Sequence, residues 1–148
     1  MAFAITVRRG TNALVVGFVA GFVAVLVFHQ GIFTLLHALG VVGATPFSSH
    51  PVPPWGVPQI WSQSFWGGVW GIVFVLAQRG FPHGVGYWVA CFLFGAIALT
   101  AVAWFIVAPL KGLPLGMGFS RASLIIGPLV NGAWGLGTGF MLRWHGSA

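Results

Sequence analysis

Four long apolar runs dominate this chain and restrict the folds that are open to it. They cover residues 13–39, 60–77, 87–110 and 124–142. A membrane-spanning helix needs about 20 mostly apolar residues, so each run meets or approaches that length. The runs lack the alternation of polar and apolar residues that a transmembrane barrel requires. We therefore expect an all-α integral membrane protein, a single domain of residues 1–148 with four transmembrane helices in a compact bundle.

The charged residues support this fold class and exclude several activities. The chain has six Lys and Arg residues and no Asp or Glu. A soluble domain needs charged residues over about a quarter to a third of its surface. Without carboxylates the chain cannot form a Ser-His-Asp triad, a carboxylate acid-base pair or a carboxylate-bridged metal centre. A single cysteine, Cys91, excludes a disulfide within one chain and a Cys-rich zinc site.

The basic residues also predict an orientation. They are scattered, so we expect them to meet lipid head groups and not nucleic acid. Four would lie on one side of the membrane (Arg8, Arg9, Arg79, Arg143) and two on the other (Lys111, Arg121). We expect a protein of the inner (plasma) membrane, and the positive-inside rule then predicts that both termini lie in the cytoplasm. The connection of residues 40–59, with five prolines, would form a stiff outer loop without regular helix.

A repeated pattern links the second and fourth runs. The sequence Gly-Val-Trp-Gly-Ile at 68–72 resembles Gly-Ala-Trp-Gly-Leu at 132–136, and Arg79 corresponds to Arg143 at the same offset of 64. This pattern predicts two repeated helical hairpins that enter the membrane in the same direction. The alternative is chance similarity in a chain rich in glycine and tryptophan.

Pairs of glycines four residues apart predict close helix packing. Such spacing lets two helix backbones approach each other within a membrane. The pairs inside the apolar runs are Gly17 with Gly21, Gly67 with Gly71, and Gly135 with Gly139. We expect these faces to pack either within the bundle or between subunits.

Polar side chains concentrate at one end of the four predicted helices. The other end contains almost none apart from Thr138. A water-filled pore would need polar lining at all depths, or a second vestibule beyond a gate. We therefore expect a blind cup that opens to the outer face. Its candidate residues are His29, Gln30, Thr34, His37, Gln59, Gln63, Trp66, Trp70, Arg121 and Asn131.

The expected cup suits an amphipathic ligand. Imidazole, amide and indole donors beside apolar walls match a quinone or a lipid head group. The alternative is that these side chains hydrogen-bond one another across helices and bind nothing. The sequence requires no cofactor, and a bis-His haem is disfavoured because the other three runs contain no facing histidine. His29 and His37 would lie about 12 Å apart along a helix, so no metal site is predicted.

Three functions follow from these features. We favour a small multi-pass protein without a catalytic set that acts as an accessory or assembly subunit. It would bind membrane lipids and form a homo-oligomer or join a larger membrane complex through its glycine-lined face. The first alternative is an oligomeric channel or transporter for a small neutral or anionic solute. A membrane enzyme with His29 or His37 as base is disfavoured, because no carboxylate is present to orient the imidazole.

Overall fold

A computed structural model describes residues 2–146, with side chains described from residue 12 onward. The chain is mostly helical (77%) and contains four helices long and apolar enough to span a membrane. Most of the helix ends lie one to three residues from the ends of the predicted runs. The four helices cover Asn12–Ala38, Gln59–Gly80, Val85–Leu110 and Arg121–Trp144.

The first of these helices contains a wider turn near its middle. Helix α1 (Ala2–Ala24) passes into a π-helical segment, η1 (Val25–His29), and continues as α2 (Gln30–Ala38). The run has no proline, and the backbone stays right-handed helical across both junctions. Single π-helical turns within an α-helix frequently occur at functional sites. Here the segment ends at His29, one of the predicted cup residues.

The proline-rich connection contains a small hairpin that the sequence did not predict. Strand β1 (Pro51–Val52) pairs antiparallel with β2 (Val57–Pro58), with Pro51 opposite Pro58. Proline lacks a backbone N–H, which limits how far such a ladder extends. Helix α3 (Gln59–Ala77) follows directly, so Gln59 belongs to the helix and not to the loop. A 3-10 turn, η2 (Gln78–Gly80), ends this helical segment.

The third helix alternates between α and π geometry, and the fourth is regular. The third consists of α4 (Val85–Leu93), η3 (Phe94–Leu99), α5 (Thr100–Val102), η4 (Ala103–Val107) and α6 (Ala108–Leu110). A 3-10 segment, η5 (Leu115–Phe119), leads to α7 (Arg121–Trp144). The Ser120 side chain caps α7 by accepting a 3.1 Å hydrogen bond from the Ser123 backbone N–H.

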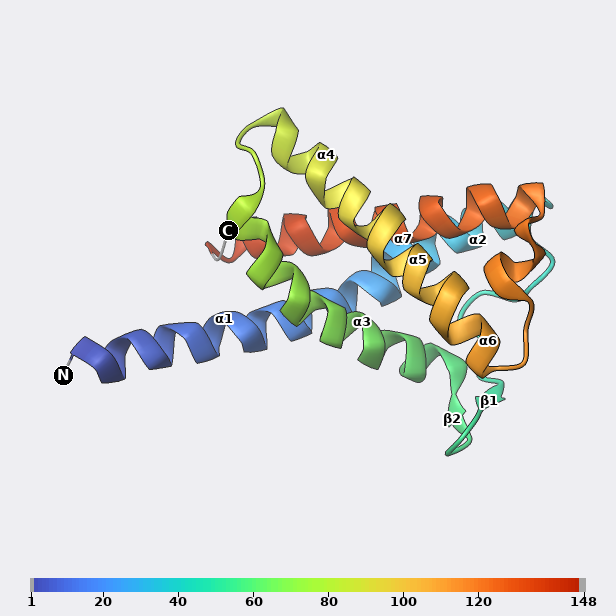
Figure 1. Ribbon diagram of the computed structural model, residues 1–148, viewed down its shortest axis with the longest axis horizontal. Helices are drawn as coiled ribbons and strands as arrows, with labels where there is room; N and C mark the ends of the chain where they lie inside the picture. Colours follow the sequence, from blue (N-terminus) through green and yellow to red (C-terminus); the bar gives the residue numbers. More distant parts are fainter. Residues whose placement is uncertain (1, 147–148) are drawn as a thin grey trace.

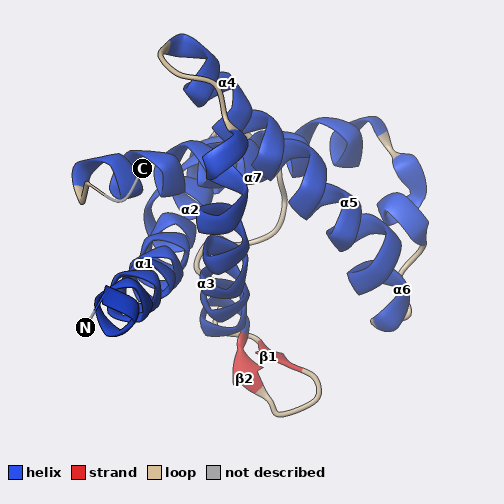
Figure 2. Cartoon of the chain, turned by 60° about the vertical axis from the view of Figure 1, so that its left-hand side comes forward, coloured by secondary structure: helices blue, strands red, loops and turns tan. Residues whose placement is uncertain are grey.

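The four helices cross one another, and the connections lie at two opposite ends (Figure 1). Both termini and the link between α3 and α4 lie at one end, with the β1–β2 hairpin and the link between α6 and α7 at the other. The first turns of α1 extend beyond the remaining helices. Figure 2 shows the hairpin extending from the end of α3 where that helix begins.

Helices α1 and α3 meet at glycines, at a contact that we name the first crossing (Gly17, Gly21, Gly67, Gly71). A Cβ atom built on Gly71 would overlap the backbone carbonyl of Gly17. One built on Gly21 would overlap the carbonyl of Gly67. The missing side chains therefore set the distance between these two helices.

A second contact of the same kind joins the third helix to α7. We name it the second crossing (Cys91, Gly95, Asn131, Gly135). A Cβ on Gly135 would overlap the carbonyl of Cys91, and one on Gly95 would overlap the carbonyl of Asn131. Gly139 lies on the same face of α7, against the Cys91 sulfur. All six glycines predicted to pack closely thus lie at contacts within the chain.

The core lies between the two crossings and is built on aromatic rings. Trp134 and Phe74 are fully buried, with their ring centroids 6.0 Å apart. The Trp134 indole Nε1 donates a 2.8 Å hydrogen bond to the backbone carbonyl of Gly21. This bond ties α7 to the first crossing, so one indole links the two helix pairs.

Candidate functional site

A small pocket lies where the first helix, the proline-rich loop and α3 meet. Its volume is about 130 Å³. We name it the polar pocket, and it is lined by His29, Gln30, Phe33, Ala44, Thr45, Ser48, Gln59 and Gln63. Four of the ten predicted cup residues are among them: the histidine and the three glutamines.

Local geometry explains why these four side chains meet. His29 ends the π-helical segment and Gln30 begins α2. Gln59 and Gln63 lie four residues apart on α3, so they project from the same helix face. Two backbone hydrogen bonds hold the loop against this helix start: the N–H of Gln59 to the His50 carbonyl at 2.9 Å, and that of Ile60 to the Ser48 carbonyl at 3.0 Å.

A chain of hydrogen bonds crosses one wall of the polar pocket. The Phe47 backbone N–H donates to Gln30 Oε1 at 2.9 Å. Gln30 Nε2 in turn donates to Gln63 Oε1 at 3.1 Å. Gln30 is 4% exposed, so its amide is satisfied at both ends inside the protein. This chain fixes the loop, α2 and α3 relative to one another.

His29 provides an unsatisfied polar atom at the same place. Its Nδ1 is buried and has no hydrogen-bond partner among the described residues. Buried side-chain nitrogens are nearly always hydrogen-bonded, to protein or to bound molecules. An imidazole nitrogen donates or accepts according to its tautomer. His29 also lines the polar pocket, so the pocket is bordered by an imidazole that lacks a protein partner at one nitrogen.

Two further cup candidates lie near the pocket without lining it. The Thr34 hydroxyl donates to the Gln30 backbone carbonyl at 2.7 Å. His37 Nδ1 lies 2.9 Å from the Val42 carbonyl, beyond the end of α2. Both side chains are exposed. They therefore contribute to the helix end and the loop start and not to an enclosed site.

The remaining four candidates are dispersed over other parts of the molecule. Asn131 donates from Nδ2 to the Thr100 hydroxyl at 2.9 Å, between α7 and α5. Trp70 packs edge-on against Phe94, with ring centroids 6.1 Å apart. Trp66 is 57% exposed on α3, and Arg121 is exposed at the start of α7. These four residues therefore do not line the polar pocket.

The loop contributes residues that the sequence did not single out. Thr45 and Ser48 line the polar pocket, and the Phe47 N–H orients Gln30. The contact of Phe47 with Gln30 joins residues 17 positions apart, which no local spacing reveals. The density of prolines in the loop was the available signal, because a stiff segment beside polar helix ends is suited to cover them.

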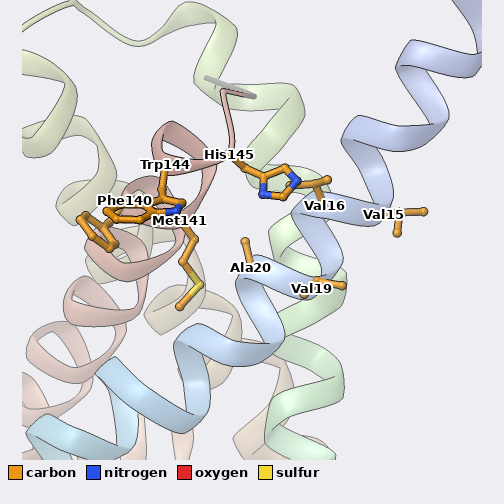
Figure 3. A pocket seen from close by; sticks show the side chains of 8 residues that line it. All are labelled: Val15, Val16, Val19, Ala20, Phe140, Met141, Trp144 and His145. Atoms are coloured by element: carbon orange, nitrogen blue, oxygen red, sulfur yellow. The ribbon is translucent and has the colours of Figure 1, made fainter.

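A larger groove lies at the opposite end of the molecule, between α1 and the last turns of α7 (Figure 3). Its volume is about 690 Å³. Apart from His145, whose ring lies near Val16 in Figure 3, the lining is apolar or amphipathic: Val15, Val16, Val19, Ala20, Phe140, Met141 and Trp144. None of the predicted cup residues lines this groove.

A buried polar contact also lies toward this end. The Tyr87 hydroxyl donates to Gln78 Oε1 at 3.0 Å and contacts the Gly139 carbonyl at 3.3 Å. The Arg143 guanidinium lies over the Tyr87 ring, 4.6 Å from its centroid. Such cation-π contacts are worth about 0.5–2 kcal/mol. This contact joins α4 to the end of α7 and the turn after α3.

The polar pocket can bind a ligand through hydrogen bonds from side chains that include no Lys or Arg. The described residues that line it supply one imidazole, three amides and two hydroxyls, with no Lys or Arg. Within residues 2–146, no group of three or more His, Cys, Asp or Glu is placed to hold a metal ion.

No family model, curated protein or solved structure matches this chain.

Proposed function

We propose that this chain is a small multi-pass protein of the inner membrane. In this proposal it acts as a non-catalytic accessory or assembly subunit that binds a lipid head group or a quinone in the polar pocket. The four long apolar helices and the absence of acidic residues support a membrane location. The observation that carries the binding proposal is the polar pocket itself, whose lining includes His29, a histidine with a buried and unpartnered Nδ1.

The ends of the molecule fit the proposed orientation. Both termini and the link after α3 lie together at one end (Figure 1). Arg79 and Arg143 belong to this end of the helices, as do the N-terminal Arg8 and Arg9 in the sequence. The positive-inside rule favours the cytoplasm for this end. The polar pocket would then open toward the outer leaflet, beneath the proline-rich loop.

A partner would have to contact a surface other than the glycine faces. Both crossings use those faces within one chain, and substituting side chains there would overlap backbone. Exposed apolar side chains on the outer sides of the helices remain available to lipids and partner helices. They include Val19, Val27, Phe65 and Ile97, each more than half exposed. An assembly role therefore depends on these outer surfaces.

The proposed duplication of a helical hairpin gains support from the crossings. Gly17 and Cys91 lie 74 positions apart, and the same offset relates Gly21 to Gly95. On the partner helices, an offset of 64 relates Gly71 to Gly135. In both crossings the glycines lie against backbone carbonyls at positions related by these offsets, which supports a common origin over chance similarity. We therefore propose two hairpins of common origin.

Native mass spectrometry of the full chain, purified in a mild detergent, tests the proposed function. We expect the wild type to retain a lipid or quinone, or a partner subunit. Ala44→Phe places a large ring in the polar pocket from the loop, and should abolish retention of the ligand. Val41→Phe is the matched control, since Val41 is exposed on the same loop and does not line the pocket.

Three results would count against this proposal. A monomer that carries neither ligand nor partner would remove its basis. Saturable uptake of a neutral or anionic solute into proteoliposomes, lost in His29→Ala or Asn131→Ala, would favour the alternative of an oligomeric channel or transporter. Retention of the same ligand by Ala44→Phe would place that ligand outside the polar pocket.

A further inference from the structure

The hydrogen bonds in the polar pocket fix which group of Gln63 faces a ligand. A backbone N–H only donates, so the Phe47 N–H requires the oxygen of Gln30 as its acceptor. The Gln30 amino group must then point to Gln63, and it requires the Gln63 oxygen. The Gln63 amino group is left as the donor that can serve the pocket. One rigid backbone group thus sets the orientation of two amides.

The donors face a space of a definite size. A cavity of about 150 Å³ in another protein holds one benzene ring. The polar pocket, at about 130 Å³, is similar and is partly open. It has room for one six-membered ring, and substituents on that ring would extend through the open side. Phe33 contributes an aromatic wall, and the Ala44 side chain a small apolar one.

The charge of the lining selects among ligands that accept hydrogen bonds. No Lys or Arg is among the described residues that line the pocket, so a phosphate or carboxylate group would be buried without a counter-charge. The chain has no Asp or Glu, so a cation would have no counter-charge either. A neutral ring that bears carbonyl oxygens satisfies donors without this cost.

We infer that the polar pocket binds the head group of a quinone. The ring carbonyls accept hydrogen bonds from Gln63 Nε2 and from the His29 imidazole, and Phe33 contacts the ring. The tail leaves through the open side of the pocket. This inference rests on the proposed function, which leaves the choice between lipid and quinone open, and it narrows the ligand to one chemical class.

Equilibrium dialysis of the full chain in detergent tests the inference, with ligand-free micelles as the blank. The probes are ubiquinone-1, which has a short tail, and the dimethyl ether of ubiquinol-1, which keeps the ring and the tail but has methyl ethers in place of both carbonyls. We expect saturable binding of ubiquinone-1 and at least about tenfold weaker binding of the ether, because its oxygens are weaker acceptors. Gln63→Leu removes a donor and should weaken ubiquinone-1 binding about tenfold, the effect of one hydrogen bond near 1.4 kcal/mol.

Two loop variants separate loss of the pocket from loss of the fold. Ala44→Phe should abolish ubiquinone-1 binding, whereas Val41→Phe should bind it like the wild type. Circular dichroism checks that Gln63→Leu and Ala44→Phe remain folded. If Gln63→Leu is unfolded, the test depends on the comparison of Ala44→Phe with Val41→Phe. Neither of these substitutions removes a side chain from the chain of hydrogen bonds.

The possible failures are distinguishable. If the wild type binds no ubiquinone-1 but retains a phospholipid that Ala44→Phe loses, the quinone inference is wrong and the proposed function survives. If the wild type retains no molecule and binds no probe, both are wrong. Equal binding of ubiquinone-1 and the dimethyl ether, or binding that persists in Ala44→Phe, overturns the assignment of a quinone to this pocket.

Discussion

The two helix crossings share one pattern of glycine contacts but differ in the residues around those contacts. In both, a glycine on each helix lies against a backbone carbonyl of the other: Gly21 and Gly71 in the first, Gly95 and Gly135 in the second. Beside them, the ring of Phe18 covers Gly68 and the ring of Phe92 covers Gly132. The glycines therefore fix the helix distance, and the phenylalanines close one side of each contact.

The crossings differ first in which helix carries the side chain that fills the space next to a glycine. In the first, Gly17 has none and Val75 of α3 fills the space against it. In the second, the Cys91 side chain fills the space and its counterpart on α7 is Gly139. Val75 and Gly139 are related by the offset of 64. The side chain that fills the space thus lies on α3 in the first crossing and on α4 in the second.

The second difference concerns the polar pocket. In the first pair of helices, Gln30 bonds to Gln63 and leaves space beside His29. The offset of 74 relates Gln30 to Trp104, and the offset of 64 relates Gln63 to Gly127. The Trp104 indole nitrogen lies 3.4 Å from the position that a Cβ atom on Gly127 would occupy. An indole occupies the place that a pair of amides holds in the other half. A shared helix crossing therefore specifies the scaffold, and residues at its end decide whether a pocket exists.

The largest expected effect comes from adding side chains at the crossings. Gly71→Val and Gly135→Val should each lower the free energy of unfolding by about 3 kcal/mol or more, because the new atoms overlap backbone that cannot move aside. Unfolding by SDS titration in detergent measures this loss. Gly31→Val is the control, since nothing lies within 4 Å of a Cβ there. A large loss in only one crossing would contradict their equivalence.

A smaller effect separates the two related tryptophans, Trp134 and Trp70. Trp134 is fully buried and hydrogen-bonded to Gly21, whereas Trp70 is half-buried. Trp134→Phe should cost about 2–3 kcal/mol from the lost hydrogen bond and the cavity left behind. Trp70→Phe should cost less than about 1 kcal/mol. Equal losses in the same titration would mean that the Trp134 bond contributes nothing.

The helices and the close packing of the glycine faces could be predicted from the sequence, whereas the residues that line the pocket could be predicted only in part. Helix number follows from apolar runs, because a lipid environment demands such lengths. The pairing of Gly21 with Gly67 did not follow, since spacing along one helix does not name the partner helix. Trp66 and Trp70 were assigned to the cup from a helical wheel. The wheel gives direction but not the neighbouring helix, and Trp70 instead packs on Phe94.

The exchanged side chains offer a sharper test of the comparison. Gly139→Ala should cost about 1–2 kcal/mol, because its methyl group meets the Cys91 sulfur. Adding Cys91→Gly should restore part of that loss, since the pair then resembles Gly17 with Val75. We expect a coupling energy of about 0.5–1 kcal/mol in a double-mutant cycle. Strict additivity would show that Cys91 and Gly139 do not share one space.

The smallest expected effect belongs to the hydrogen bond between Asn131 and Thr100. In the first crossing the position equivalent to Asn131 is Gly67, so only the second crossing has this polar contact. Hydrogen bonds between helices in membranes average about 0.6 kcal/mol in double-mutant cycles. Asn131→Leu and Thr100→Val, singly and together, should therefore couple by about that amount.

The same cycle distinguishes a structural from a ligand-binding role for Asn131. A coupling near the expected value, with ubiquinone-1 binding unchanged in Asn131→Leu, means that this amide serves only to join α7 to α5. A loss of ubiquinone-1 binding would extend the binding site beyond the polar pocket and restore the wider cup that the sequence predicts. Because Asn131 bonds to Thr100 and does not line the pocket, we expect the first result.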